Sequence, residues 1–210
     1  MLKSQDIIDG LQIIVNEYTL FSTIWHIVFY VLIVALIAKG KPSNKLFAIL
    51  TCLPALSVGV FAWLSRNPFN GSLFILLAIL ILIFGLKASS KPIHVSQLPF
   101  AVAGIGMIVF GLIYPHFIET KSVIEYLYAS PIGLIPCPTL SILIGFLLLF
   151  NGFSSQSLTL TLIFFGLFYG IFGVLKLAVY LDLFLVFGTI TLLLKYILSF
   201  KVFGSQKRNR

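Results

Sequence analysis

Charged side chains are scarce in this sequence, and acidic ones are the scarcest. Of the 210 residues, fourteen are Lys or Arg and six are Asp or Glu, which is 10% charged against 60% apolar. Soluble globular domains carry about 25% charged and about 45–50% apolar residues. This composition therefore excludes an ordinary soluble domain and indicates a chain that lies mostly in lipid.

The residue types that usually carry metal or covalent chemistry are also few. The chain has three histidines and two cysteines, and it has no glycine-rich phosphate loop and no Ser-His-Asp spacing. Membrane zinc hydrolases gather several histidines with carboxylates, but we expect His94 at the opposite membrane face from His26 and His116. We therefore expect no cofactor. A two-histidine metal site completed by a carboxylate remains an alternative, with three candidates: Glu17, Glu119 and Asp182.

Long apolar runs dominate what is present. A membrane-spanning helix needs about 20 apolar residues. The sequence predicts an all-α, polytopic membrane helix bundle of seven transmembrane helices, with approximate bounds 19–38, 46–64, 68–86, 97–118, 131–150, 158–177 and 183–202.

The charges orient these runs. If the N-terminus is external, all six acidic residues are external and ten of the fourteen basic residues are cytoplasmic, as the positive-inside rule requires. We expect a multi-pass protein of the cell membrane, with a transmembrane domain at 19–203 and a basic cytoplasmic tail at 204–210. The lipid bilayer is its expected partner. Nucleic acid is not, because topology and anionic headgroups explain the basic residues.

Residues 1–18 are expected to form a short amphipathic external helix rather than a signal peptide. Ser4 can cap it, and its apolar residues recur at helical spacing. A frayed tail that continues into the first span is the alternative. The predicted apolar face consists of Ile7, Leu11, Ile14, Val15 and Tyr18.

The fifth run is irregular. Pro131, Gly133, Pro136 and Pro138 fall within eight residues, and proline disrupts a helix and its preceding residue. We predict a broken fifth helix that starts regularly at Pro138, with Cys137 at the cap. Irregular backbone at membrane depth must be buried by protein or line a cavity.

Three interpretations of this segment stay open: a proline-kinked helix entrance, the lining of a cavity, or a reactive thiol at a helix N-terminus. Cys52 and Cys137 are not expected to pair. Their predicted depths differ by roughly 14 Å, and a disulfide allows at most about 7 Å between Cα atoms.

Several landmarks occur in a recognisable order. Pro136-Cys137-Pro138-Thr139, Asn67-Pro68 and Tyr114-Pro115, with Trp25 and Asp182, resemble a family of uncharacterised bacterial multi-pass membrane proteins, a domain-of-unknown-function family. The resemblance implies a seven-span fold in a bacterial inner membrane and carries no activity. The sequence departs from the family pattern at five positions: His26, Phe69, Asn70, Leu140 and Leu143.

Polar residues of different spans are predicted at one depth, in the outer half. We expect an outward-facing pocket that binds, transports or senses a small solute or lipid headgroup. One alternative is a cysteine- or metal-dependent enzyme at the outer leaflet, with Cys137 as nucleophile and His26 or His116 as base. Another is a non-catalytic assembly subunit. Lys195 is expected to snorkel to the inner face. The predicted site residues are Glu17, Trp25, His26, Asn67, Tyr114, His116, Cys137, Thr139 and Asp182.

Overall fold

The computed structural model describes residues 4–38, 44–87, 93–120, 122–152 and 155–208. In these ranges the chain is all-α apart from one pair of two-residue strands. The helices and strands are α1 (Ser4–Glu17), α2 (Thr19–Ile37), α3 (Asn44–Leu64), α4 (Pro68–Leu86), β1 (His94–Val95), α5 (Leu98–Leu112), η1 (Val123–Glu125), α6 (Tyr126–Ala129), α7 (Pro136–Leu149), β2 (Phe150–Asn151), α8 (Gln156–Leu177), η2 (Tyr180–Asp182) and α9 (Leu183–Arg208).

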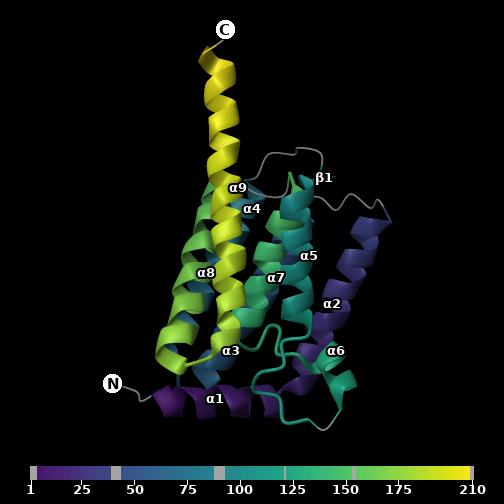
Figure 1. Ribbon diagram of the computed structural model, residues 1–210. Helices are drawn as coiled ribbons and strands as arrows, with labels where there is room; N and C mark the ends of the chain where they lie inside the picture. Colours follow the sequence, from purple (N-terminus) through teal and green to yellow (C-terminus); the bar gives the residue numbers. More distant parts are fainter. Residues whose placement is uncertain (1–3, 39–43, 88–92, 121, 153–154, 209–210) are drawn as a thin grey trace.

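Five helices are long and apolar enough to cross a membrane: α2, α3, α4, α8 and α9. Two shorter apolar helices, α5 and α7, run beside them. These seven helices lie roughly along one direction, and α1 lies across one end of the bundle (Figure 1). The described parts of the chain begin and finish at opposite ends of the bundle.

The helix α7 is the centre of the bundle. It packs against α3, α5, α8 and α9, and every residue from Pro138 to Leu148 is buried. The preceding segment, 130–135, is not helical and is also buried. The predicted irregular backbone is therefore enclosed by protein, as the absence of water in a bilayer requires.

The start of α7 differs from the prediction. The helix begins at Pro136, two residues before Pro138, and the extended Ile135 occupies the cap position. Cys137 is thus the second helical residue and not the cap. The two prolines are tolerated because N–H groups of the first turn have no partner within the helix.

A turn before α7 is fixed by one hydroxyl group. Thr139 Oγ1 donates to the carbonyl oxygen of Ile135 at 2.8 Å and accepts from the Gly133 N–H at 2.9 Å. Gly133 has φ +72°, and a Cβ there would collide with the Trp25 indole. Glycine is therefore needed for both its conformation and its size.

The predicted N-terminal helix is present as α1, and its apolar face packs on the protein. Ile14 and Val15 are buried in a cluster with Phe61, Tyr114 and Leu134. Because α1 turns its apolar face towards the other helices, it covers one end of the bundle.

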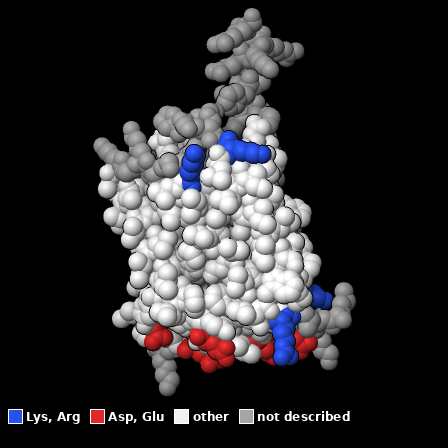
Figure 2. Space-filling model, turned by 180° about the vertical axis from the view of Figure 1, so that it is seen from behind, with Lys and Arg blue, Asp and Glu red and all other residues white. Residues whose placement is uncertain are grey.

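On the face shown in Figure 2, the charged side chains lie towards the ends of the bundle. Figure 2 shows acidic side chains gathered at the end where α1 lies, and a broad middle zone of that face without charged side chains. Cys52 and Cys137 are free thiols, as predicted. Helix α9 continues to Arg208, so it includes much of the predicted tail 204–210.

Candidate functional site

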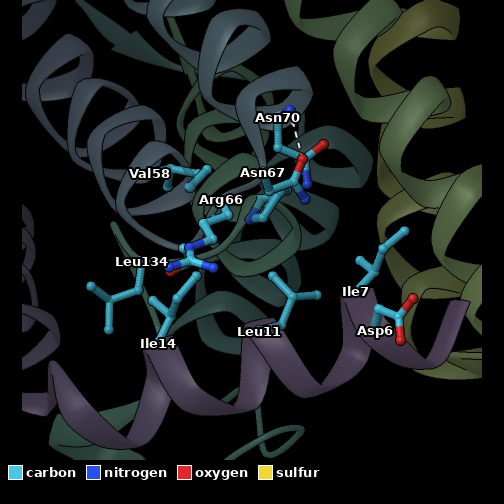
Figure 3. A pocket seen from close by; sticks show the side chains of 13 residues that line it. Asp6, Ile7, Leu11, Ile14, Val58, Arg66, Asn67, Asn70 and Leu134 are labelled. Carbon is cyan, nitrogen blue, oxygen red and sulfur yellow. Dashed lines mark hydrogen bonds between the residues drawn. The ribbon is translucent and has the colours of Figure 1, made fainter. Parts of the chain in front are cut away.

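A cavity lies between α1 and the end of the bundle that it covers. Its volume is about 110 Å³, and Ile7 and Leu11 of α1 form one wall. The opposite wall comes from the turn between α3 and α4, with Arg66 and Asn67, and from Asn70 in α4 (Figure 3). This cavity is therefore open to the external end of the predicted topology.

A second, smaller cavity of about 30 Å³ adjoins the first, and we call it the deep cavity because the buried Asp182 forms part of its wall. The two share Ile7, Leu11, Asn70 and Pro136. Together they form one pocket beneath α1. We call it the α1 pocket. Its deep wall contains Tyr114, Cys137, Tyr169 and Asp182.

Asp182 is the most buried charged side chain of the pocket, at 2% exposure. Tyr114 donates its hydroxyl proton to Oδ1 of Asp182 over 2.9 Å. The Cys137 thiol donates to Oδ2 over 3.1 Å. The chain thus brings a carboxyl, a phenol and a thiol together from three separate segments.

The turn between α8 and α9 positions this carboxyl. Ala178 adopts a left-handed conformation, φ 55°, which ends α8, and Asp182 then donates its backbone N–H to Val179. Gly173 of α8 faces the carboxylate so closely that a Cβ would collide with it. A larger residue there would displace Asp182.

A second polar pair lines the pocket beside Asp182. Tyr169 donates its hydroxyl proton to Oδ1 of Asn70 over 3.2 Å, and Asn70 is 8% exposed. The Asn67 side chain caps α4 by accepting from the Asn70 N–H. Asn70 and Tyr169 are not among the site residues predicted from the sequence. Asn70 lies in the first turn of α4, at the end of the bundle that α1 covers, and this depth is the signal that could have found it.

Four of the nine predicted site residues line the α1 pocket: Asn67, Tyr114, Cys137 and Asp182. Two of the other predicted residues, Trp25 and Thr139, make hydrogen bonds that stabilise the fold. Trp25 donates its indole N–H to Ser57 over 3.2 Å, and Thr139 holds the turn before α7.

His26 is buried, and both of its ring nitrogens contact the backbone. Its Nδ1 lies 2.8 Å from the Ser22 carbonyl oxygen, and its Nε2 lies 3.0 Å from that of Leu112. Both ring nitrogens thus face carbonyl oxygens, and neither is recorded in contact with Cys137. The geometry of the described residues thus gives no support to His26 as a general base.

Glu17 and His116 lie apart from Asp182. Glu17 is exposed and lines a shallow groove on α1 together with Asp9 and Glu119. The His116 ring is half-buried and packs against Phe117, with ring centroids 4.1 Å apart. Neither residue lines the α1 pocket.

The environment of Cys137 does not favour a thiolate. A reactive thiolate is stabilised by positive charge nearby, whereas the partner of this thiol is a carboxyl group. Among the described residues, no group of three or more His, Cys, Asp and Glu could hold a metal ion.

Comparisons with protein-family models, with curated proteins and with solved structures find no match to this chain. The resemblance to a membrane protein family therefore stays a prediction, and the function must be argued from the α1 pocket.

Proposed function

We propose that this chain is an integral membrane protein that crosses the bilayer seven times and binds a small polar solute in the α1 pocket, on the external side. The crossings are the five long apolar helices and the shorter α5 and α7. At 1.5 Å per residue, α7 covers about 21 Å of a core about 30 Å thick, and the buried segment 130–135 supplies the remainder.

The observation that carries this proposal is the burial of Asp182 beside a cavity. Ionisable groups inside membrane proteins are costly and tend to face the bundle interior, where they mark ligand or ion pathways. Asp182 is buried and hydrogen-bonded at the base of a pocket that is open under α1.

The dimensions of the pocket support a small solute. Drug-sized ligands occupy pockets of about 300–1,000 Å³, whereas the larger cavity here measures about 110 Å³. A solute of a few non-hydrogen atoms fits this space.

Cys137 provides a direct test because it lines the pocket and the chain has one other cysteine. We expect a small, membrane-impermeant methanethiosulfonate reagent to label Cys137 in intact cells that express the Cys52→Ser chain. Labelling should be slower than at an exposed external thiol, because α1 covers the pocket.

Two controls accompany this experiment. Val123→Cys, in a chain without the native cysteines, reports full external exposure, since Val123 is 80% exposed. Cys137→Ser, with Cys52 retained, should give no labelling. Leu11→Cys, in a chain without the native cysteines, places a thiol in the same pocket away from Asp182. If the reagent labels Val123→Cys and reaches neither Cys137 nor Leu11→Cys, the pocket is not open to the outside and the proposal fails.

A further inference from the structure

The charge of Asp182 has no partner within its own cavity. Both donors to its oxygens, Tyr114 and Cys137, are neutral groups. No lysine, arginine or histidine stands among the described residues that line the deep cavity. Arg66 lines the outer cavity and is itself exposed, and the half-buried His116 ring lies 6.5 Å from the Tyr114 ring, measured between centroids, without lining either cavity.

Burying a carboxylate without a cation costs several kcal/mol. The hydroxyl and thiol donors offset part of this cost, and neither of them brings a positive charge. A carboxylate has about four lone-pair sites, and the two side-chain donors fill two of them. The remaining sites and the charge both call for a cationic group in the cavity.

We infer that the deep cavity binds the ammonium group of a small amine, with Asp182 as its counter-ion. This inference rests on the proposed function and names the class of solute. A primary ammonium has three N–H donors. The cavity offers acceptors on Asp182, on Asn70 and on the phenol oxygens.

The aromatic side chains that line the deep cavity also favour an ammonium group. The deep cavity is lined by the aromatic side chains of Tyr114, Phe117, Tyr169 and Phe172. Ring faces attract cations, and ammonium groups are recognised in this way. The cavity volume of about 30 Å³ exceeds the roughly 10–15 Å³ that one water molecule needs, so it accepts an ammonium head. The adjoining outer cavity leaves space for a short carbon chain.

The test uses the full chain with Cys52→Ser, purified in detergent, so that Cys137 is the reporter. Its rate of modification by methyl methanethiosulfonate, a small neutral reagent, is measured in methylammonium chloride and in N-methylglucamine chloride of equal ionic strength. Methylammonium at about ten times its Kd should slow the reaction about tenfold. N-methylglucamine is too large for the pocket and should have no effect.

The matched variant is Asp182→Asn, which keeps the shape of the side chain and removes the charge. Methylammonium should then give no protection, judged by the ratio of rates within each chain. Val123→Cys, in a chain without the native cysteines, should react equally in both salts. The melting temperature of the unaltered protein gives a test that needs no variant at Asp182. Methylammonium chloride should raise this temperature above its value in N-methylglucamine chloride.

The other possible outcomes of this experiment would each overturn the inference. Equal protection by sodium or potassium chloride would show an alkali-metal site. Equal rates in all salts, with an unchanged melting temperature, would show that Asp182 carries a proton and receives no amine. Both results leave the proposed pocket standing, whereas no modification of either Cys137 or Leu11→Cys in any salt would remove the pocket and the amine together.

Discussion

Replacing Lys195 with methionine is expected to lower the free energy of unfolding by about 3 kcal/mol. The Lys195 ammonium donates to Ser96 Oγ at 2.7 Å and to the carbonyl oxygens of Leu147 and Leu148 at 2.6 and 3.2 Å, and it lies 3.3 Å from that of Phe150. These carbonyls end α7, where the helix has unpaired acceptors and partial negative charge. Methionine keeps the length of the side chain and leaves the acceptors without a donor.

Lys195 is predicted to snorkel to the inner membrane face, and the structure shows that its ammonium binds Ser96 and carbonyl oxygens at the end of α7. The side chain turns inwards because the end of α7 offers several acceptors within its reach. The effect of Lys195→Met can be measured by unfolding the purified protein with sodium dodecyl sulfate, followed by circular dichroism. Lys87→Met is the control, since Lys87 is exposed, and it should leave the stability within about 0.5 kcal/mol. An equal loss for both variants would contradict this role of Lys195.

The second large effect is expected at the crossing of α5 and α7. A Cβ on Gly104 would lie 2.5 Å from the backbone nitrogen of Leu149 and 2.8 Å from the carbonyl oxygen of Gly145. Backbone atoms cannot rotate away as a side chain does. Gly104→Ala should therefore force the two helices apart and lower the free energy of unfolding by about 2–3 kcal/mol.

Gly106 provides a matched control two residues along the same helix. A Cβ there would meet its nearest neighbour, Phe184 Cζ, at 3.6 Å, which is an ordinary contact. Gly106→Ala should be neutral or stabilising by up to about 1 kcal/mol, because alanine favours a helix more than glycine does. The same detergent titration compares the two, and similar values for both variants would show that helix propensity, not close packing, decides the result.

The helices could be predicted closely from the sequence where their ends carry clear signals. The run 68–86 coincides with α4, Pro68–Leu86, because Asn67 caps the helix and Pro68 follows at the first position. The start of α7 was harder. Three prolines in that segment are each a candidate for the helix start. The sequence cannot show that Ile135 is extended, or that Pro136 and Pro138 both lie in the first turn of α7.

The site was predicted in part because depth can be read from the sequence and helix rotation cannot. Tyr114, Cys137 and Asp182 are predicted at one depth. In the structure, Asp182 accepts hydrogen bonds from Tyr114 and Cys137, which are 68 and 45 residues away in sequence. Trp25 and His26 lie in the same outer half but face other partners. Asn70 lies at the same end of the bundle, but the sequence alone cannot show that its side chain faces Tyr169.

The sidedness of the bundle is the most direct test of the whole account, because the α1 pocket matters only if the acidic end is external. Single cysteines are placed at Val123 and at Lys87, on opposite ends, in a chain without the native cysteines. An impermeant maleimide should label Val123→Cys in intact cells, and Lys87→Cys only after the membrane is permeabilised. Labelling of Lys87→Cys in intact cells, with Val123→Cys protected, would contradict the account.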